Sequence, residues 1–315
     1  MSFWKNKKIL VTGGNGFVGK SVLKILAKKD ISQIISPKSS EYDLTAEKDV
    51  IKLFNNHKPD YVIHLAGKVG GVLANKLSPG DFFYKNIMMG SLIMQYARLN
   101  GVKKLVALAA GCGYPKHLKV PFKESDFWLD LPDENSIGYS MAKKMLIIQS
   151  WTYREQFNFN SSILLPANIY GPNDNFDLEN SHVVPALIRK FVEAKDNNKN
   201  EVVIWGSGTA SREFLHVNDT ARAILDVLEF YNQSGPLNLG TGVPTTIKEL
   251  VILLKELTNF NGNIIWDKSK PDGQPQRYYD MSLFKKNIGY VPKISLREGL
   301  QITIDWFNEN KNSIK

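Results

Sequence analysis

A tyrosine and a lysine that could handle a proton together stand four residues apart, at Tyr139 and Lys143. On a helix this spacing places both side chains on one face, where the lysine cation can lower the pKa of the phenol. Such a phenol can exchange a proton with an alcohol or a carbonyl group. Unrelated surface residues often share this spacing, so the pair gains weight only from its surroundings.

A glycine-rich segment near the start of the chain supplies such surroundings. It runs Val11-Thr12-Gly13-Gly14-Asn15-Gly16-Phe17-Val18-Gly19, between an apolar run and a helical pattern. Glycines between a strand and a helix permit a tight turn and let backbone amides approach a pyrophosphate at the helix N-terminus. The segment therefore predicts a dinucleotide site, with Gly13, Gly16, Phe17, Val18 and Gly19 as binding residues.

The end of the second predicted strand bears on the choice of dinucleotide. An NAD enzyme usually places an acidic side chain there, for the ribose hydroxyls. Here the stretch is Ser36-Pro37-Lys38-Ser39-Ser40, whose cation and hydroxyls suit a 2′-phosphate. We therefore expect NADP(H), with Lys38 at the phosphate and with Asp43 and Leu44 near the adenine.

The elements that must position these residues alternate between short apolar runs and longer helical patterns. Strands are predicted at 8–11, 33–35, 61–65, 105–110 and 161–165, and helices at 17–27, 46–55, 81–99 and 136–156. This alternation is typical of an α/β protein with a Rossmann-type, doubly wound parallel sheet. The helix at 81–99 is apolar around much of its circumference. This pattern fits a homodimer contact and a wholly internal helix about equally well.

The alternation loosens beyond residue 166, where a Gly, Pro and Asn-rich stretch precedes a helix near His182. Thr246 with Glu249, and Ser295 with Glu298, have the spacing of capping boxes at helix starts. We expect a dinucleotide-binding domain at 1–168, with return segments near 215–243. A smaller C-terminal α/β substrate domain is expected at 169–214 and 244–315.

Composition excludes several classes of protein. The chain has 315 residues, and no apolar run approaches the roughly 18 residues of a membrane span. Cys112 is the only cysteine, so an internal disulfide and a multi-cysteine metal site are excluded. The net charge of +9 is spread without an aromatic-interleaved basic motif, so no nucleic acid partner is expected. We also expect no metal site and, without a signal peptide, a cytoplasmic protein.

Beyond these general motifs, the chain resembles the extended short-chain dehydrogenase/reductases nearly end to end, and within them the GDP-L-fucose synthases. The matching stretches are Lys68-Val69-Gly70-Gly71, Asn86, Cys112 with Tyr114-Pro115-Lys116, Pro166 to Pro172, Asn180 to Leu187, Val203 to Thr209, Arg212 to Val217 and Lys270-Pro271-Asp272-Gly273. The resemblance implies an NADPH-dependent enzyme that epimerises a GDP-linked 4-keto sugar at carbons 3 and 5, then reduces the carbon-4 ketone.

The resemblance also implies residue roles. Tyr139 would donate the proton in the reduction, and Lys143 would be its electrostatic partner and bind the nicotinamide ribose. Cys112 and His182 would be the acid and base of the epimerisation. Further cofactor contacts are implied at Ala66, Gly67, Pro166, Asn168 and His182, and substrate contacts at Asn168, Lys190, Trp205, Arg212 and Arg277.

The sequence departs from the family at one catalytic position. Ala110 stands where the family has a hydroxyl-bearing serine, and Gly111 where a second serine is usual. The loss of one carbonyl donor can lower turnover about 100 to 1000-fold. Together with Ala109, these small residues are expected to widen the pocket floor and to admit a bulkier sugar such as a heptose.

Three alternative functions stay open from the sequence. The first is a reductase-only enzyme for a GDP-4-keto-heptose, and the second is another sugar-nucleotide epimerase or dehydratase with tightly held NAD. The third is a non-catalytic dinucleotide-binding regulator.

Overall fold

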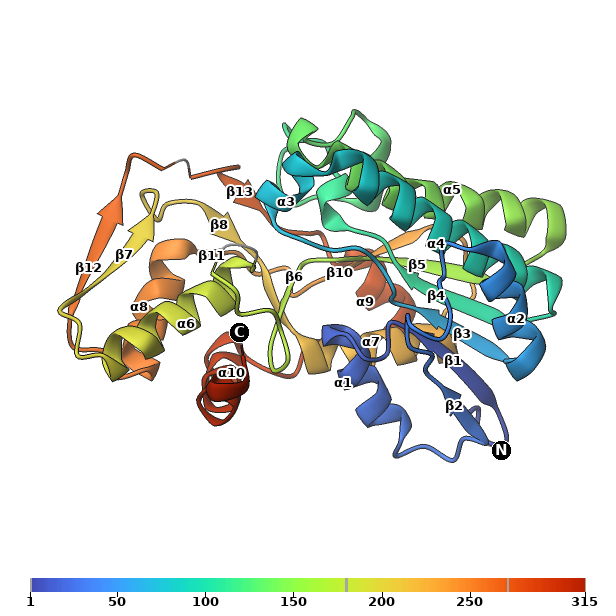
Figure 1. Cartoon of the computed structure of the whole chain (residues 1–315). Coiled ribbons are helices and arrows are strands. Elements are labelled where there is room, and N and C mark those ends of the chain that lie inside the picture. Colours follow the sequence, from blue (N-terminus) through green and yellow to red (C-terminus); the bar gives the residue numbers. More distant parts are fainter. Residues whose placement is uncertain (1, 179–180, 271, 315) are drawn as a thin grey trace.

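The sheet that carries the glycine-rich turn is parallel and six-stranded, with the order β10-β5-β4-β3-β1-β2 (Figure 1). The computed structural model describes residues 2–178, 181–270 and 272–314. The six strands are β1 (Lys8–Thr12), β2 (Gln33–Ile35), β3 (Tyr61–His64), β4 (Lys104–Leu108), β5 (Ser161–Pro166) and β10 (Pro236–Leu239). The inner strands are buried and largely apolar because helices cover both faces of the sheet.

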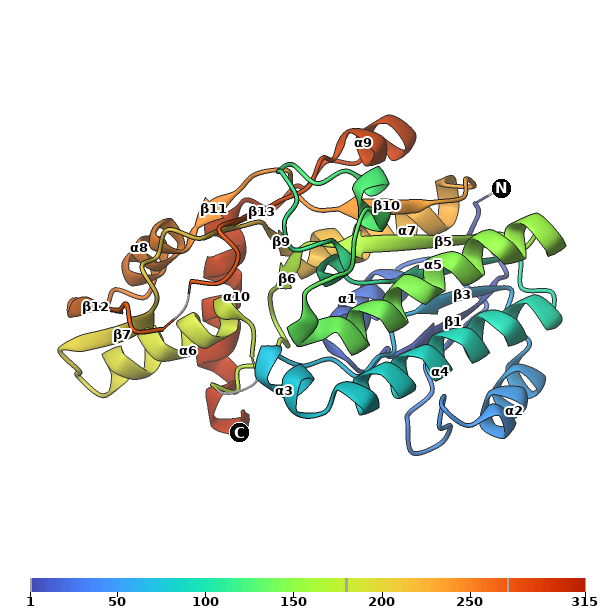
Figure 2. The same cartoon turned by 90° about the horizontal axis from the view of Figure 1, so that it is seen from above.

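Five helices form the two covering layers, as Figures 1 and 2 show from two directions. On one face lie α2 (Glu47–His57), α4 (Pro79–Leu99) and α5 (Ile137–Phe157), and on the other lie α1 (Phe17–Leu26) and α7 (Val217–Phe230). The predicted Rossmann-type class is confirmed. The predicted strands and helices in this part agree with the observed bounds to within about two residues, whereas β10 lies only within a predicted return segment.

The second lobe is smaller. Its main elements are α6 (Val183–Asp196), β7 (Glu201–Trp205), α8 (Ile247–Leu257), β12 (Asn263–Asp267) and α10 (Leu296–Asn310). Short strands join the lobes: β6 (Asn168–Tyr170) pairs with β9 (Phe214–His216), and β8 (Ser211–Arg212) pairs with β11 (Thr245–Thr246) and β13 (Gln276–Arg277). The remaining α-helices are α3 (Val72–Leu77) and α9 (Ser282–Ile288). The capping box at Thr246 and Glu249 is present, and Ser295 accepts from the amide of Glu298.

The buried apolar side chains fall into two clusters. The first core includes the sheet, α7 and β10, and the second includes α6, α8 and α10. The division into two domains with a return segment stays a prediction. The distribution of buried side chains differs from the predicted boundaries in one respect, because Tyr279, Met281, Phe284 and Tyr290 pack in the first core.

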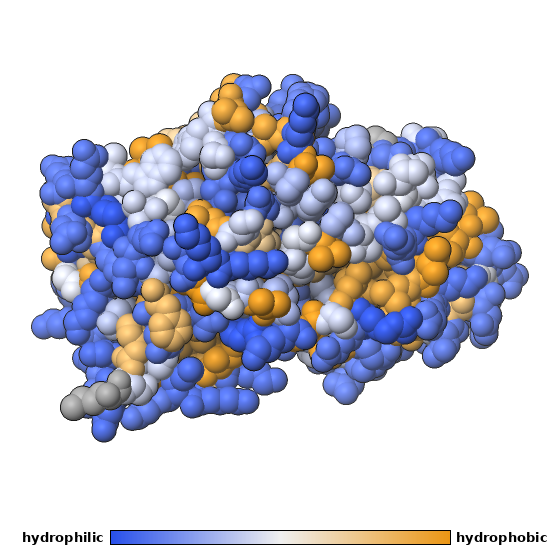
Figure 3. Space-filling model, turned by 180° about the vertical axis from the view of Figure 1, so that it is seen from behind, coloured by the Kyte–Doolittle hydropathy of each residue, from blue (hydrophilic) through white to orange (hydrophobic). Residues whose placement is uncertain are grey.

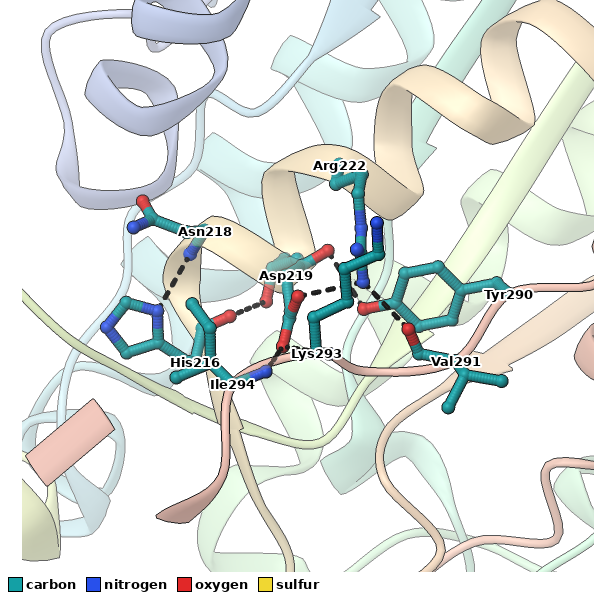
Figure 4. Close-up of polar contacts among 9 residues, drawn as sticks. His216, Asn218, Asp219, Arg222, Tyr290, Val291, Lys293 and Ile294 are labelled. Atoms are coloured by element: carbon teal, nitrogen blue, oxygen red, sulfur yellow. Dashed lines mark hydrogen bonds and ion pairs between the residues drawn. The ribbon is translucent and has the colours of Figure 1, made fainter. Parts of the chain in front are cut away.

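A buried carboxylate ties α7 to the segment at 290–294 (Figure 4). One oxygen of Asp219 accepts from the amides of Lys293 and Ile294, both at 2.9 Å, and the other pairs with Arg222 at 2.8 Å. The hydroxyl of Tyr290 donates to the Asp219 carbonyl at 3.0 Å. These bonds hold the chain that leads into α10 against the lobe that contains the six-stranded sheet.

The surface seen from behind is mainly hydrophilic, with its largest hydrophobic band over the second lobe (Figure 3). None of the helices in the described ranges is long and apolar enough to cross a membrane. Within residues 2–178, 181–270 and 272–314, no three His, Cys, Asp or Glu side chains are grouped as metal ligands would be.

Candidate active site

The glycine-rich turn packs directly against the end of β3. Gly13 has a φ of +70°, and a Cβ added there would lie 2.7 Å from the amide nitrogen of Ala66. A Cβ on Gly19 would lie 2.5 Å from the Cα of Gly14, so α1 begins tight against the turn. Gly16 caps α1 without a side-chain hydrogen bond, which leaves the first amides of the helix to an anion. Because β1 lies between β2 and β3, this turn stands where the strand order reverses.

An orphaned hydroxyl lies at the far side of the same turn. Ser36 Oγ is buried and has no hydrogen-bond partner in the described structure, and a Cβ on Gly14 would collide with it. Lys38 follows with an exposed side chain, and its amide donates to Glu41 at 3.0 Å. An unpaired hydroxyl against the glycine turn, with an exposed cation two residues later in the chain, fits a phosphorylated ribose.

The two residues expected near the adenine have structural contacts of their own. The carboxylate of Asp43 accepts from the amide and the hydroxyl of Thr45, at 2.9 and 2.7 Å. These bonds lower the pKa of Asp43. Leu44 packs against the first core.

Tyr139 and Lys143 lie on α5 and reach the edge of the sheet where the glycine turn stands. Lys143 is buried, and its Nζ donates to the Leu108 carbonyl at the end of β4 at 3.2 Å. A Cβ on Gly67 would lie 3.4 Å from that Nζ, and the Nζ lies 5.9 Å from the centroid of the Tyr139 ring. The predicted pair and the Ala66-Gly67 stretch are therefore brought together.

Burial dominates the ionisation of this pair. It lowers the pKa of Lys143 to about 8, with Cys112 acting in the opposite direction. It raises the pKa of Tyr139, and the neighbouring Cys112 raises it further. The expected lowering of the phenol pKa by Lys143 is therefore wrong for this structure, because burial and the neighbouring Cys112 both raise that pKa. Tyr139 is consequently held as the protonated phenol, the form that a proton donor needs.

Cys112 lies in the 3₁₀ turn Gly111–Gly113. Its Sγ is 3.1 Å from the hydroxyl of Ser140, the residue after Tyr139. His182 is the residue before α6, on the second lobe. Solvent reaches its side chain, yet the protein atoms around it lower the pKa of its imidazole by desolvation.

The floor beside Cys112 differs from the expectation of a widened pocket. Ala109 and Ala110 are buried, and a Cβ on Gly111 would lie 2.9 Å from the Pro166 carbonyl and closer still to the hydroxyl of Tyr279. That hydroxyl donates to the Pro166 carbonyl at 3.1 Å. The expectation of extra pocket space at Gly111 is wrong, because the Tyr279 hydroxyl fills that space.

The expected substrate residues form two groups. Arg277 donates to the Gly111 carbonyl, and Arg212 donates to the Gln274 carbonyl at 2.6 Å. Burial and the neighbouring Arg277 lower the pKa of Arg212, so the two cations lie near each other, as a diphosphate site requires. In the second group, the Nζ of Lys190 lies 5.6 Å from the ring centroid of Trp205, whose side chain is 64% exposed. Burial lowers the pKa of Lys190.

Asn168 belongs to neither group in its contacts. Its side-chain amide donates to the Glu213 carbonyl at 3.0 Å, across the β6 and β9 pair. Asn180 and Pro271, which contribute to the family resemblance, lie outside the described residues.

Two polar centres of the site are not predicted by the sequence analysis. His64 ends β3, its Nδ1 is 2.8 Å from Thr12 Oγ1, and burial lowers its pKa to about 3, which keeps the imidazole neutral beside Lys143. The buried carboxylate of Glu213 accepts from the amides of Thr241, Gly242 and Tyr279. Because Thr12 and His64 end neighbouring parallel strands, their spacing in the strand pattern could have revealed the first of these centres.

Known proteins are similar to this chain in sequence and fold. The family described as "NAD dependent epimerase/dehydratase family" matches residues 9–240. A putative GDP-L-fucose synthase 2 of Arabidopsis thaliana is 42% identical over 306 residues, which are 97% of this chain and 93% of that protein. A GDP-L-fucose synthetase from Naegleria fowleri, solved bound to NADP, is 30% identical with a TM-score of 0.90, covering 99% of this chain and 97% of that one. A GDP-6-OMe-4-keto-L-xylo-heptose reductase from C. jejuni is 29% identical with a TM-score of 0.90, covering 97% and 98%.

Proposed function

The chain belongs to the NAD dependent epimerase/dehydratase family, and we propose that it reduces the carbon-4 ketone of a GDP-linked 4-keto-6-deoxy sugar with NADPH. The observation that carries this proposal is the position of Lys143. Its ammonium lies against Gly67, at the strand ends where the glycine turn binds a dinucleotide, and Tyr139 stands beside it. This proximity supports Tyr139 as the proton donor to a ketone that faces the nicotinamide.

The residues present fit NADP(H), which supplies a hydride to the ketone when bound. The Gly13 to Gly19 turn offers the free amides of α1 to the pyrophosphate. The unpartnered hydroxyl of Ser36 and the exposed cation of Lys38 suit the 2′-phosphate. Lys143 would bind the ribose on the nicotinamide side, and its position against Gly67 supports this role.

Tyr139 donates a proton to the ketone oxygen as the alcohol forms. The Lys143 ammonium then stabilises the phenolate that remains. Because Ala110 brings no hydroxyl, Tyr139 is the protein donor that we assign to the ketone. A hydroxyl of the sugar itself can take the place of the missing serine.

Epimerisation at carbons 3 and 5 precedes the reduction in this proposal. Protons beside a ketone are acidic because the carbanion is delocalised as an enolate, so one group must remove a proton and another must return it on the opposite face. Cys112 and His182 are the candidate pair. They come from different lobes, which suits an acid and a base on opposite faces of one sugar ring.

A second candidate function is reduction alone, on an already epimerised GDP-4-keto-heptose. It is favoured by the similarity to the C. jejuni heptose reductase and by the absence of the serine hydroxyl at Ala110. The filled space at Gly111 argues against a simple widening of the pocket for the larger sugar.

The protein is proposed to act as a cytoplasmic homodimer through α4 and α5. These helices lie side by side on the outer face of the dinucleotide lobe (Figure 2). Phe83 and Tyr84 on α4 are 41% and 56% exposed, and Ile137 and Ile148 on α5 are also exposed. Phe83→Glu should convert a dimer to a monomer in analytical ultracentrifugation, and a wild-type monomer would refute this part.

The reaction is tested by offering GDP-4-keto-hexoses and GDP-4-keto-heptoses with NADPH in D₂O. NADPH consumption measures the reduction, and the mass of each product counts the deuterium incorporated beside the ketone. Deuterium at carbons 3 and 5 supports the complete proposal. Reduction without deuterium supports the reductase-only candidate, and no NADPH consumption with any 4-keto sugar refutes both.

A further inference from the structure

A buried serine contacts the only cysteine of the chain. Ser140 is fully buried on α5, and its hydroxyl lies 3.1 Å from both the Sγ and the carbonyl oxygen of Cys112. The hydroxyl of Ser136, one helical turn earlier, is 3.2 Å from that of Ser140. Since Ser136 is only partly buried, the three groups form a chain from the sulfur toward solvent.

The chemistry of the sulfur gives this contact a use. A cysteine removes a proton only as its thiolate. A hydroxyl that donates to a thiolate makes a charge-assisted hydrogen bond, about twice as strong as a neutral one. The other titratable side chains whose charge acts on this region are Lys143, Tyr139 and Tyr279, and burial keeps the two phenols protonated by raising the pKa of each.

We propose that Ser140 is a positioning residue for Cys112: its hydroxyl stabilises and orients the thiolate, and with Ser136 it returns the proton that the sulfur acquires to water. This inference rests on the proposed epimerisation. The thiolate takes a proton from the carbon beside the ketone and becomes a thiol, leaving an enolate that His182 reprotonates on the opposite face. The thiol then donates to Ser140, Ser140 passes its own proton to Ser136, and Ser136 passes its own to water. The sulfur is again a thiolate, and no electrons are transferred.

The first test measures the thiol without any sugar. Iodoacetamide alkylates Cys112, and the rate is followed against pH for wild type, Ser140→Ala and Ser150→Ala. Ser150 is the matched control, because it is also a buried serine on α5 but bonds to Ser161 at 2.7 Å. Cys112→Ser shows the background rate.

We expect the alkylation-rate profiles of wild type and Ser140→Ala to cross as the pH rises. Loss of the hydrogen bond should reduce the thiolate population at pH 7 about tenfold. The remaining thiolate is intrinsically more nucleophilic, which recovers about half of that effect on a logarithmic scale. Ser140→Ala should therefore react about threefold more slowly at pH 7 and about threefold faster at pH 11, whereas Ser150→Ala follows wild type. A change in packing alone would not produce such a crossing, and coincident profiles for Ser140→Ala and wild type would overturn the inference.

The second test separates this inference from the function on which it rests. Deuterium incorporation from D₂O and NADPH oxidation are measured together with a GDP-4-keto-hexose. Ser140→Ala should slow the incorporation about tenfold more than Ser150→Ala does, with Ser136→Ala between them. Wild-type incorporation with an unaffected Ser140→Ala would overturn the inference alone. No incorporation by wild type, with NADPH still consumed, would overturn the epimerisation and the inference with it.

Discussion

Gly111 should be intolerant of any side chain, because Tyr279 occupies the space that a side chain needs. A Cβ at position 111 would lie 2.9 Å from the Pro166 carbonyl, 3.1 Å from Tyr279 Cζ, and inside any allowed contact with the Tyr279 hydroxyl. Tyr279 is 3% exposed and packs against Tyr114, with the ring centroids 5.5 Å apart. Neither the ring nor the hydroxyl can therefore move without disturbing the first core.

The magnitude follows from two contributions. Overpacking of this kind costs about 1 to 3 kcal/mol. Displacing the Tyr279 hydroxyl also breaks its 3.1 Å bond to Pro166, which is worth about 1 kcal/mol. Gly111→Ala should thus lower the free energy of unfolding by about 2 to 4 kcal/mol. Tyr279→Phe alone should cost about 1 kcal/mol, through the lost hydrogen bond.

The double variant makes this a test of the contact itself. In Gly111→Ala with Tyr279→Phe the colliding hydroxyl is gone, so the two losses should not add. We expect a coupling of about 1 to 2 kcal/mol in a double-mutant cycle measured by urea unfolding. Losses that add to within about 0.5 kcal/mol would refute the reasoning, as would a Gly111→Ala protein as stable as wild type.

Three further predictions concern buried charges. Because burial lowers the pKa of Lys143 to about 8, its ammonium is lost above that pH. The kcat/KM for NADPH-dependent reduction should fall as pH rises through about 8, and Lys143→Arg should move that fall upward; a flat profile would contradict this. Burial lowers the pKa of Lys104 to about 7, so between pH 7 and 9 this lysine is protonated in the unfolded chain but largely neutral in the folded one. The free energy of unfolding of wild type should therefore rise with pH in this range. Its slope should exceed that of Lys104→Met by up to about 1.4 kcal/mol per pH unit. Equal slopes in urea titrations would exclude that explanation. Asp219→Asn leaves Arg222 without its carboxylate and should cost about 3 kcal/mol in urea unfolding, and a loss below about 1 kcal/mol would show that the network in Figure 4 is dispensable.

The sequence predicts those parts of the fold that depend on local patterns. The run at 8–11 and the glycine turn after it are encoded in neighbouring residues, and so is the helix that carries Tyr139 and Lys143. Burial of both faces of the sheet follows from the apolar runs. These features therefore appear at their predicted places.

The details of the site depend on contacts between residues that are distant in sequence. No local pattern reveals that the Tyr279 hydroxyl fills the space at Gly111, or that Ser140 meets Cys112. The pKa of Tyr139 is a similar case, since helical spacing places Lys143 nearby but the surrounding core decides the desolvation. The return of residues 279–290 to the first core is likewise set by packing.

The central claim, that Tyr139 gives its proton to the ketone, is tested most directly by the rate of a single turnover. Wild type and Tyr139→Phe are each mixed with NADPH and the 4-keto sugar that wild type reduces, and NADPH absorbance is followed in time. Loss of the proton donor should slow the oxidation at least about 100-fold, while NADPH still binds with unchanged affinity. Oxidation by Tyr139→Phe at the wild-type rate would contradict the account.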